Sequence, residues 1–124
     1  MMRILFVDDD QRLLAGLRRS LRNLEDEWAM TFADSAADAM RLLPISTFDV
    51  VVTDLAMPDV DGYSFLQFVI ENAPNAGRVV FSGQNEAVHD LTGAQVAHVV
   101  LVKPADTSML VDAVRMAYRA RGAN

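Results

Sequence analysis

Phe48-Asp49-Val50-Val51-Val52-Thr53-Asp54 is the stretch that decides the fold class of this 124-residue sequence. Its core is β-branched and apolar on both faces, and burial on both faces is typical of a central strand in a parallel sheet. Four other apolar runs have the length of a strand: residues 4–7, 28–32, 79–81 and 99–102. The sequence therefore predicts five strands.

Amphipathic segments separate these strands. Leu14, Leu17, Leu21 and Leu24 recur every three or four residues after Asp10, which predicts a helix with one apolar face. Further helices are expected over residues 35–43, 62–72 and 85–91 and from residue 106 onward, with the weakest pattern at 85–91. Strands that alternate with helices in this way build right-handed βα units around a parallel sheet covered on both faces. The prediction is a single α/β domain.

Composition excludes several classes of protein. With 52% hydrophobic residues the chain can bury a core, which excludes intrinsic disorder. The longest apolar runs are strand-sized and the first residues lack the apolar stretch of a secretory signal, so we expect no membrane association and a cytoplasmic location. The absence of cysteine excludes disulfides and thiolate metal sites. The net charge of −6 argues against direct nucleic acid binding.

Polar side chains stand where the predicted strands end. They are Asp8 and Asp9 after the first strand, Asp54 after the third, Ser82 after the fourth and Lys103 after the fifth. In a parallel sheet these ends meet at one edge, where the ligands of such sheets bind. Each residue alone has a structural explanation as a turn or strand-end residue, and Asp10 as the cap of the first helix. Their joint placement predicts carboxylates, a hydroxyl and an ammonium group in one crevice.

The composition of this cluster indicates phosphoryl chemistry. Crowded carboxylates repel one another unless a cation lies among them, and a set of oxygen ligands suits a hard ion, Mg²⁺ first. His89 and His98 lie elsewhere, and we expect them to be surface or packing residues. A metal opposite a lysine and a hydroxyl stabilises a transferring phosphoryl group. A carboxylate can itself be the nucleophile, and Asp54, at the end of the most buried strand, is the best candidate.

The same motifs resemble the receiver domain of two-component response regulators. The resemblance covers nearly all of the chain. The motifs that carry it are Val7-Asp8-Asp9-Asp10, the segment Asp-Leu-Ala-Met-Pro-Asp-Val-Asp-Gly at 54–62, Ser82-Gly83 and Lys103-Pro104. It implies a flavodoxin-like three-layer sandwich, a five-stranded parallel sheet of order 2-1-3-4-5 and five helices. It also implies a receiver domain over residues 1–120, followed by a tail or the start of a linker over 121–124.

The resemblance implies roles for the acidic residues. Asp54 would accept a phosphoryl group from the phosphohistidine of a sensor histidine kinase or a phosphotransfer protein. Mg²⁺ would be held by Asp9, Asp54 and the backbone carbonyl of Ala56, and Asp8 would contribute through a water molecule. The protein would be a signalling switch and not an enzyme, apart from its own phosphoryl transfer and slow dephosphorylation.

The resemblance also implies roles around the cluster. Lys103 would pair with the Asp54 carboxylate and then with the phosphoryl oxygens, and Ser82 would turn inward to bond the phosphoryl group. Pro104 would follow a cis peptide bond. Ala56 and Gln84 occupy the two positions that tune dephosphorylation in receivers. Ala56 has no side-chain group that can orient a water molecule.

Two details bear on how the switch is read. Many receivers carry Tyr or Phe three residues before the lysine, where this chain has Val100, so the usual aromatic signal is absent. Phe81-Ser82-Gly83-Gln84 and Lys103-Pro104-Ala105-Asp106 are similar to receivers joined to HD-type output domains. As partners, the resemblance implies the kinase or phosphotransfer protein, an output domain beyond residue 124, and a second copy of the chain upon phosphorylation.

Two other functions are alternatives to the phosphoacceptor switch. A Mg²⁺-dependent phosphohydrolase with an Asp nucleophile typically has a second acid two residues later, where this chain has Ala56. A pseudo-receiver that only binds partners would be expected to lack one of the acids or the lysine, and this chain keeps all of them. The switch is therefore favoured.

Overall fold

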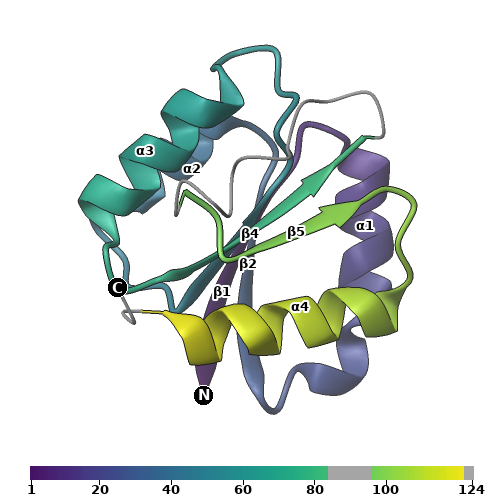
Figure 1. Cartoon of the computed structure of the whole chain (residues 1–124). Coiled ribbons are helices and arrows are strands. Elements are labelled where there is room, and N and C mark those ends of the chain that lie inside the picture. Colours follow the sequence, from purple (N-terminus) through teal and green to yellow (C-terminus); the bar gives the residue numbers. More distant parts are fainter. Residues whose placement is uncertain (84–95, 122–124) are drawn as a thin grey trace.

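A computed structural model describes residues 1–83 and 96–121 of the chain (Figure 1). Its strands are β1 (Met2–Val7), β2 (Trp28–Ala33), β3 (Val50–Thr53), β4 (Gly77–Ser82) and β5 (Val99–Val102). Its helices are α1 (Gln11–Ser20), the short 3-10 helix η1 (Arg22–Leu24), α2 (Ala36–Leu42), α3 (Gly62–Asn72) and α4 (Thr107–Ala120). None of these helices is long and apolar enough to cross a membrane.

The five strands form one parallel sheet in the order β2-β1-β3-β4-β5. Helices α1 and α4 cover one face, and α2 and α3 cover the other (Figure 1). The α/β fold class and the strand order are therefore confirmed. Four of the five expected α-helices are present among the described residues. The fifth, expected over residues 85–91, lies outside them.

Alternate residues of each strand enter two different apolar layers, because successive side chains of a strand point to opposite faces. Phe6 and Val52 pack in the layer beneath α1 and α4, whereas Leu5 and Val51 pack in the layer beneath α2 and α3. All four are buried, and each such side chain contributes roughly 1.5–3 kcal/mol through removal from water. The same alternation decides which strand-end residues face one another across the rim of the sheet.

Several element boundaries differ from the sequence prediction, and β1 and β4 each begin two residues earlier than expected. β3 begins at Val50 and not at Phe48, because Asp49 makes two hydrogen bonds with Arg3 on β1, one through its backbone and one through its side chain. The Asp49 N–H donates to the Arg3 carbonyl at 2.7 Å, and the Asp49 carboxylate accepts from the Arg3 N–H at 2.8 Å. The predicted leucine stripe after Asp10 also breaks: α1 ends at Ser20, and Leu24 belongs to η1.

Side chains cap all four α-helices among the described residues, and at α1 the cap is Asp10, as the sequence predicts. The Asp10 carboxylate accepts hydrogen bonds from the backbone N–H groups of Arg12 and Leu13, at 3.0 and 3.2 Å. The Ser35 hydroxyl accepts from the N–H of Asp38 at 3.0 Å. Each cap of this kind contributes about 1 kcal/mol. Asp10 is therefore committed to starting α1, which leaves Asp8 and Asp9 as the acids of the first strand end.

A buried arginine and a histidine connect β4 to the chain that leads into β5. Arg78 is 3% exposed, and its Nε donates to the Val96 carbonyl at 2.7 Å. The Arg78 backbone N–H donates to Nδ1 of His98 at 2.9 Å. Burial, and then the charge of Arg78, lower the pKa of His98. His98 is thus a packing residue, one of the two alternatives expected for it, whereas His89 lies outside the described residues.

The lowered pKa of His98 predicts a loss of stability in mild acid. The unfolded chain takes up a proton on this imidazole at higher pH than the folded chain does, so stability falls as the pH drops below about 6.5. In the His98→Asn variant the amide oxygen replaces Nδ1 as acceptor and cannot be protonated. We expect urea unfolding between pH 7.5 and 5 to show a smaller loss for His98→Asn than for the wild type. Parallel pH profiles for the two proteins would contradict this expectation.

Candidate functional site

Three carboxylates gather at the rim of the sheet where β1 and β3 end. Asp8 and Asp9 follow β1, Asp54 follows β3, and one carboxylate oxygen from each of the three lies within 4.8 Å of the others. The two strands are neighbours, and the Asp54 N–H continues their ladder by donating to the Val7 carbonyl at 3.0 Å. The sequence prediction that these residues meet is therefore correct.

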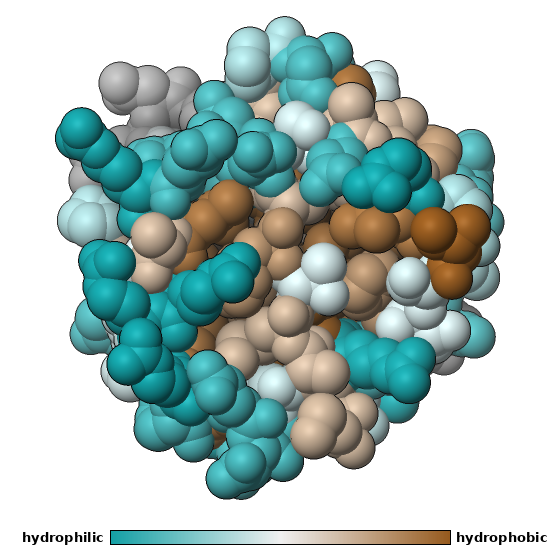
Figure 2. All heavy atoms as spheres, turned by 180° about the vertical axis from the view of Figure 1, so that it is seen from behind, coloured by the Kyte–Doolittle hydropathy of each residue, from teal (hydrophilic) through white to brown (hydrophobic). Residues whose placement is uncertain are grey.

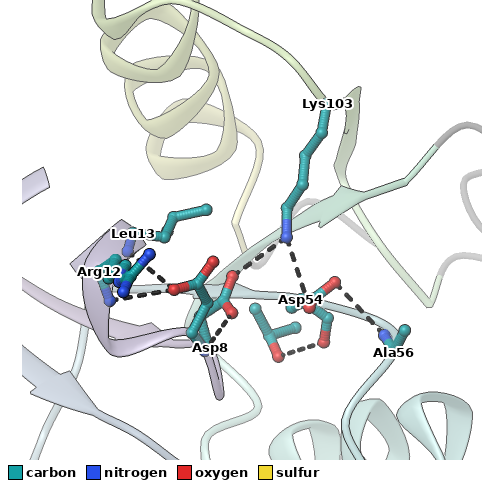
Figure 3. Close-up of polar contacts among 8 residues, drawn as sticks. Asp8, Arg12, Leu13, Asp54, Ala56 and Lys103 are labelled. Carbon is teal, nitrogen blue, oxygen red and sulfur yellow. Dashed lines mark hydrogen bonds and ion pairs between the residues drawn. The ribbon is translucent and has the colours of Figure 1, made fainter. Parts of the chain in front are cut away.

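Lys103 brings a positive charge to this cluster from the end of β5. Its ammonium nitrogen is 3.2 Å from Oδ2 of Asp8 and 3.4 Å from Oδ2 of Asp54 (Figure 3). The ion pairs join residues 95 and 49 positions apart in the sequence, and one ammonium group serves both carboxylates. The peptide bond between Lys103 and Pro104 is cis.

Burial and the neighbouring charges act in opposite directions on the pKa values of Asp8 and Lys103. Asp8 is 3% exposed and Asp54 is 6% exposed, whereas Asp9 is exposed. Burial raises the pKa of Asp8 above its usual value, although a hydrogen bond from Asp10 and the charge of Lys103 oppose the rise. For Lys103, burial acts to lower the pKa, but the charges of Asp8 and Asp54 outweigh it, so the pKa of Lys103 is raised. The ammonium group is therefore held in its charged form.

Backbone N–H groups orient the two buried carboxylates. Oδ1 of Asp8 accepts from the N–H of Asp10 at 2.9 Å, and Oδ1 of Asp54 accepts from the N–H of Ala56 at 3.3 Å (Figure 3). In both residues Oδ1 faces the loop that follows the strand, and Oδ2 faces Lys103. The two oxygens of each carboxylate thus have separate partners, which fixes the direction of the side chain.

Ser82 lies at the end of β4 but on the opposite face of the sheet from the ion pairs. Ser82 is two residues after Val80 on the strand, so both side chains point to the same face, where Val80 packs towards α3 with Leu66 and Val96. Ser82 is fully buried, and its hydroxyl oxygen has no hydrogen-bond partner among the described residues. Its backbone carbonyl accepts from the Lys103 N–H at 2.7 Å, so backbone geometry ties Ser82 to the lysine.

The structure places the other predicted site residues as follows. Ala56 is exposed in the loop after β3, and its N–H points to Asp54. Val100 is half-buried on β5 and packs on the same face as Val80. Gln84 lies outside the described residues.

Sequence reasoning missed one residue of the site. The Lys103 ammonium nitrogen lies over the ring of Phe81, 5.4 Å from the ring centroid. The signal available in the sequence was the alternation of β4. Phe81 precedes Ser82 and therefore points to the other face, where Asp8 and Asp54 also lie.

The cluster has the chemistry of a site for a hard divalent cation. It offers carboxylate oxygens from buried Asp8 and Asp54 and from exposed Asp9, with no nitrogen or sulfur ligand among them. A site of this kind suits an ion that keeps several waters and takes few protein ligands. The exposed carboxylate gives access from solvent, while the buried pair provides negative charge that Lys103 neutralises only in part.

Comparison with known proteins agrees with this arrangement. A family model described as the response regulator receiver domain matches residues 4–115. The hydrogenase transcriptional regulatory protein HoxA of Cupriavidus necator is 33% identical over 121 residues, which are 96% of this chain and 24% of HoxA. The chain thus spans about a quarter of the length of that relative.

Two solved structures have the same architecture. One, described as adenylate cyclase from Rhodopirellula baltica, is 29% identical with a TM-score of 0.79, and the match covers 94% of this chain and 87% of that one. A CheY-like receiver domain protein from Methanospirillum hungatei matches 96% of this chain and 94% of its own with a TM-score of 0.85. At 19% identity this second likeness concerns the fold alone.

The shared ammonium group leads to a prediction about stability. Lys103→Met keeps the length of the side chain but leaves two buried carboxylates without their cation. We expect a loss of roughly 1–3 kcal/mol in the free energy of unfolding at pH 7, below the value for fully buried pairs because solvent reaches the lysine. The loss should shrink as the pH falls and the carboxyl groups take up protons.

A second substitution tests the physical cause of that loss. Adding Asp54→Asn to Lys103→Met removes one of the two unpaired charges and should restore part of the stability. Urea denaturation of the wild type, both single variants and the double variant gives the coupling energy directly. Additive effects of the two substitutions would contradict the shared-cation explanation.

Proposed function

The chain belongs to the response regulator receiver domain family of two-component systems, and on that premise we propose that it is a phosphorylation-dependent signalling switch with Asp54 as phosphoacceptor. The observation that supports this choice is the position of Asp54 in the centre of the site. It ends a central strand, lies within reach of both neighbouring acids, and is paired with Lys103. Asp8 also pairs with Lys103 but ends β1, the second strand in the sheet order, whereas Asp54 ends β3, the middle strand, and Asp9 is exposed.

Phosphoryl transfer to Asp54 forms one bond and breaks another. A carboxylate oxygen of Asp54 attacks the phosphorus of a phosphohistidine on the donor protein. The P–N bond breaks, its electron pair returns to the imidazole nitrogen, and that nitrogen takes up a proton from water. The product is an acyl phosphate on Asp54. Lys103, 3.4 Å from the Asp54 carboxylate, supplies positive charge to the phosphoryl oxygens during the transfer.

Mg²⁺ is the cation proposed for the acidic cluster. Asp9, Asp54 and the backbone carbonyl of Ala56 would hold it, and Asp8 would contribute through a water molecule. The all-oxygen donor set and the small number of protein ligands support this choice. When bound, the ion would neutralise negative charge on the transferring phosphoryl group.

Ser82 is proposed as the residue that senses the phosphoryl group. A buried hydroxyl without a partner costs roughly 1–3 kcal/mol, and Ser82 is in this condition among the described residues. A phosphoryl oxygen on Asp54 would give the hydroxyl its partner. Because Val80 and Val100 pack on the same face as Ser82, its movement would be passed to aliphatic side chains and not to an aromatic ring.

The partners follow from the proposed switch. The donor is a sensor histidine kinase or a phosphotransfer protein in the cytoplasm, and the receiver domain occupies residues 1–120. HoxA is named a transcriptional regulatory protein and is about four times longer than the match, which supports an output domain joined to the receiver. An output of the HD type is the alternative that the local motifs around Ser82 and Lys103 favour. Dimer formation upon phosphorylation belongs to the same proposal.

The phosphoacceptor is tested by intact mass measurement. With acetyl phosphate and Mg²⁺ we expect the wild type to gain about 80 Da, the mass of one phosphoryl group, and Asp54→Asn to gain nothing. Asp10→Asn is the matched control, because Asn also caps helices well and Asp10 lies outside the cluster; it should be labelled like the wild type. EDTA should abolish labelling.

Other outcomes of this measurement distinguish the alternatives. Label on Asp54→Asn would show that the phosphoacceptor is a different residue. Turnover of the phosphodonor without a stable mass increase would indicate a phosphohydrolase. A wild type that gains no mass would indicate a pseudo-receiver.

The lifetime of the phosphorylated protein is predicted from Ala56. Its N–H contacts Asp54, but its methyl group can neither donate nor accept a hydrogen bond, so it cannot orient the attacking water. We expect Ala56→Asn to dephosphorylate several-fold faster than the wild type, because an amide at this exposed position reaches the water beside Asp54. Ala56→Leu, which adds bulk without a polar group, is the control. Equal decay rates for Ala56→Asn and Ala56→Leu would exclude this explanation.

A further inference from the structure

Phe81 belongs to β4, the strand that the Lys103 side chain must extend across to reach Asp8 and Asp54. The sheet order places β4 between β3 and β5, so the ends of three strands stand in a row, with Asp54 after the first and Lys103 after the last. Phe81 shares its face of β4 with Val79, in the apolar layer beneath α1 and α4. The carboxylates lie on that face as well, whereas Ser82 points to the other.

The distance between the ends of β3 and β5 places the Lys103 ammonium group over the Phe81 ring. Adjacent strands are about 4.8 Å apart, so two strand spacings separate the ends of β3 and β5 by about 10 Å. The Lys103 and acid side chains span this distance together, and Figure 3 shows the lysine extended towards the carboxylates. In the structure its nitrogen lies over the Phe81 ring, 5.4 Å from the centroid, while remaining 3.2 and 3.4 Å from the carboxylates of Asp8 and Asp54.

An aromatic ring at this point offers more than apolar volume. The face of the ring carries partial negative charge and attracts an ammonium group, more strongly where water is excluded. Phe81 is only 8% exposed and both carboxylates are nearly buried, whereas the Lys103 side chain is 26% exposed, so the contact is partly sheltered from solvent. The ring itself is held in place because it belongs to the same packed layer as Leu110 of α4.

We propose that Phe81 is a positioning residue whose ring face holds the ammonium group of Lys103 at the position where it pairs with the carboxylates of Asp8 and Asp54. The two acids attract the ammonium group, and the ring defines the path by which it reaches them. The consequence for phosphorylation rate rests on the proposed function of Asp54. The position of Lys103 in the unphosphorylated protein does not depend on that proposed function.

Fluorination of the ring tests this role without changing its shape. Phenylalanine at position 81 is replaced by its mono-, di- and trifluoro analogues, which progressively withdraw negative charge from the ring face. Phe81→Leu removes the ring, and Phe81→Tyr keeps it. The matched control is trifluorophenylalanine at Phe65, which is fully buried in the other apolar layer.

Two measurements are made on each variant. The first is the ring-current shift of the Lys103 side-chain protons in the unphosphorylated protein, observed by NMR. We expect this upfield shift to be lost in Phe81→Leu, kept in Phe81→Tyr, and reduced step by step with the number of fluorines. The second is the initial rate of labelling by acetyl phosphate with Mg²⁺, which should fall by roughly two- to tenfold across the fluorine series. Fluorination of Phe65 should change neither.

The outcomes separate the inference from the proposed function. If the wild type gains no label but the lysine shift still follows ring fluorination, the positioning role holds and the phosphoacceptor role fails. If Phe81→Leu slows labelling while the fluorine series leaves both the rate and the lysine shift unchanged, Phe81 contributes packing alone and the inference is overturned. The same conclusion follows if Phe81→Tyr behaves like Phe81→Leu.

Discussion

One ammonium group shared between two buried carboxylates is the interaction on which this site depends. Asp8 and Asp54 end adjacent strands in the middle of the sheet, and Lys103 reaches both from beyond β4. Without that charge the two acids would repel one another in surroundings that already raise the pKa of Asp8. Lys103 offsets only part of the negative charge of the three clustered acids, so the site remains negative. It therefore suits a second cation, and a phosphoryl group that binds together with that cation.

The sheet divides the site into two halves with different tasks. Asp8, Asp54, Phe81 and Lys103 lie on the face covered by α1 and α4, and Ser82 and Val100 lie on the opposite face. The charged half holds the groups that carry out phosphoryl transfer in the proposed function. The other half holds a buried hydroxyl without a partner among the described residues and the aliphatic residues around it, so in the proposed function the phosphoryl group would be sensed on the opposite face of the sheet. The surface seen from behind is mixed, with hydrophobic side chains between hydrophilic ones (Figure 2).

Local sequence patterns account for most of the elements and for the membership of the acidic cluster. The apolar run before Asp54 identifies a central strand because only a two-sided apolar segment suits a strand covered on both faces. Asp10 and Ser35 are recognisable as helix caps because the capping bond joins residues two or three positions apart. The start of β3 was misplaced by two residues because the Asp49 carboxylate bonds to Arg3, on a strand that is remote in sequence.

The sequence by itself determined that four of the five strands end in polar residues and that these ends share one edge, since local hydropathy reflects burial and side-chain alternation. The strand order came from family resemblance, and the contacts across strands came only from the tertiary structure. Lys103 meets Asp8 and lies over Phe81, and Arg78 bonds to His98, because β4 and β5 pair with partners set by long-range hydrogen bonding. Such contacts depend on which strands are neighbours and in what register, and the hydropathy of a short segment carries no information on either.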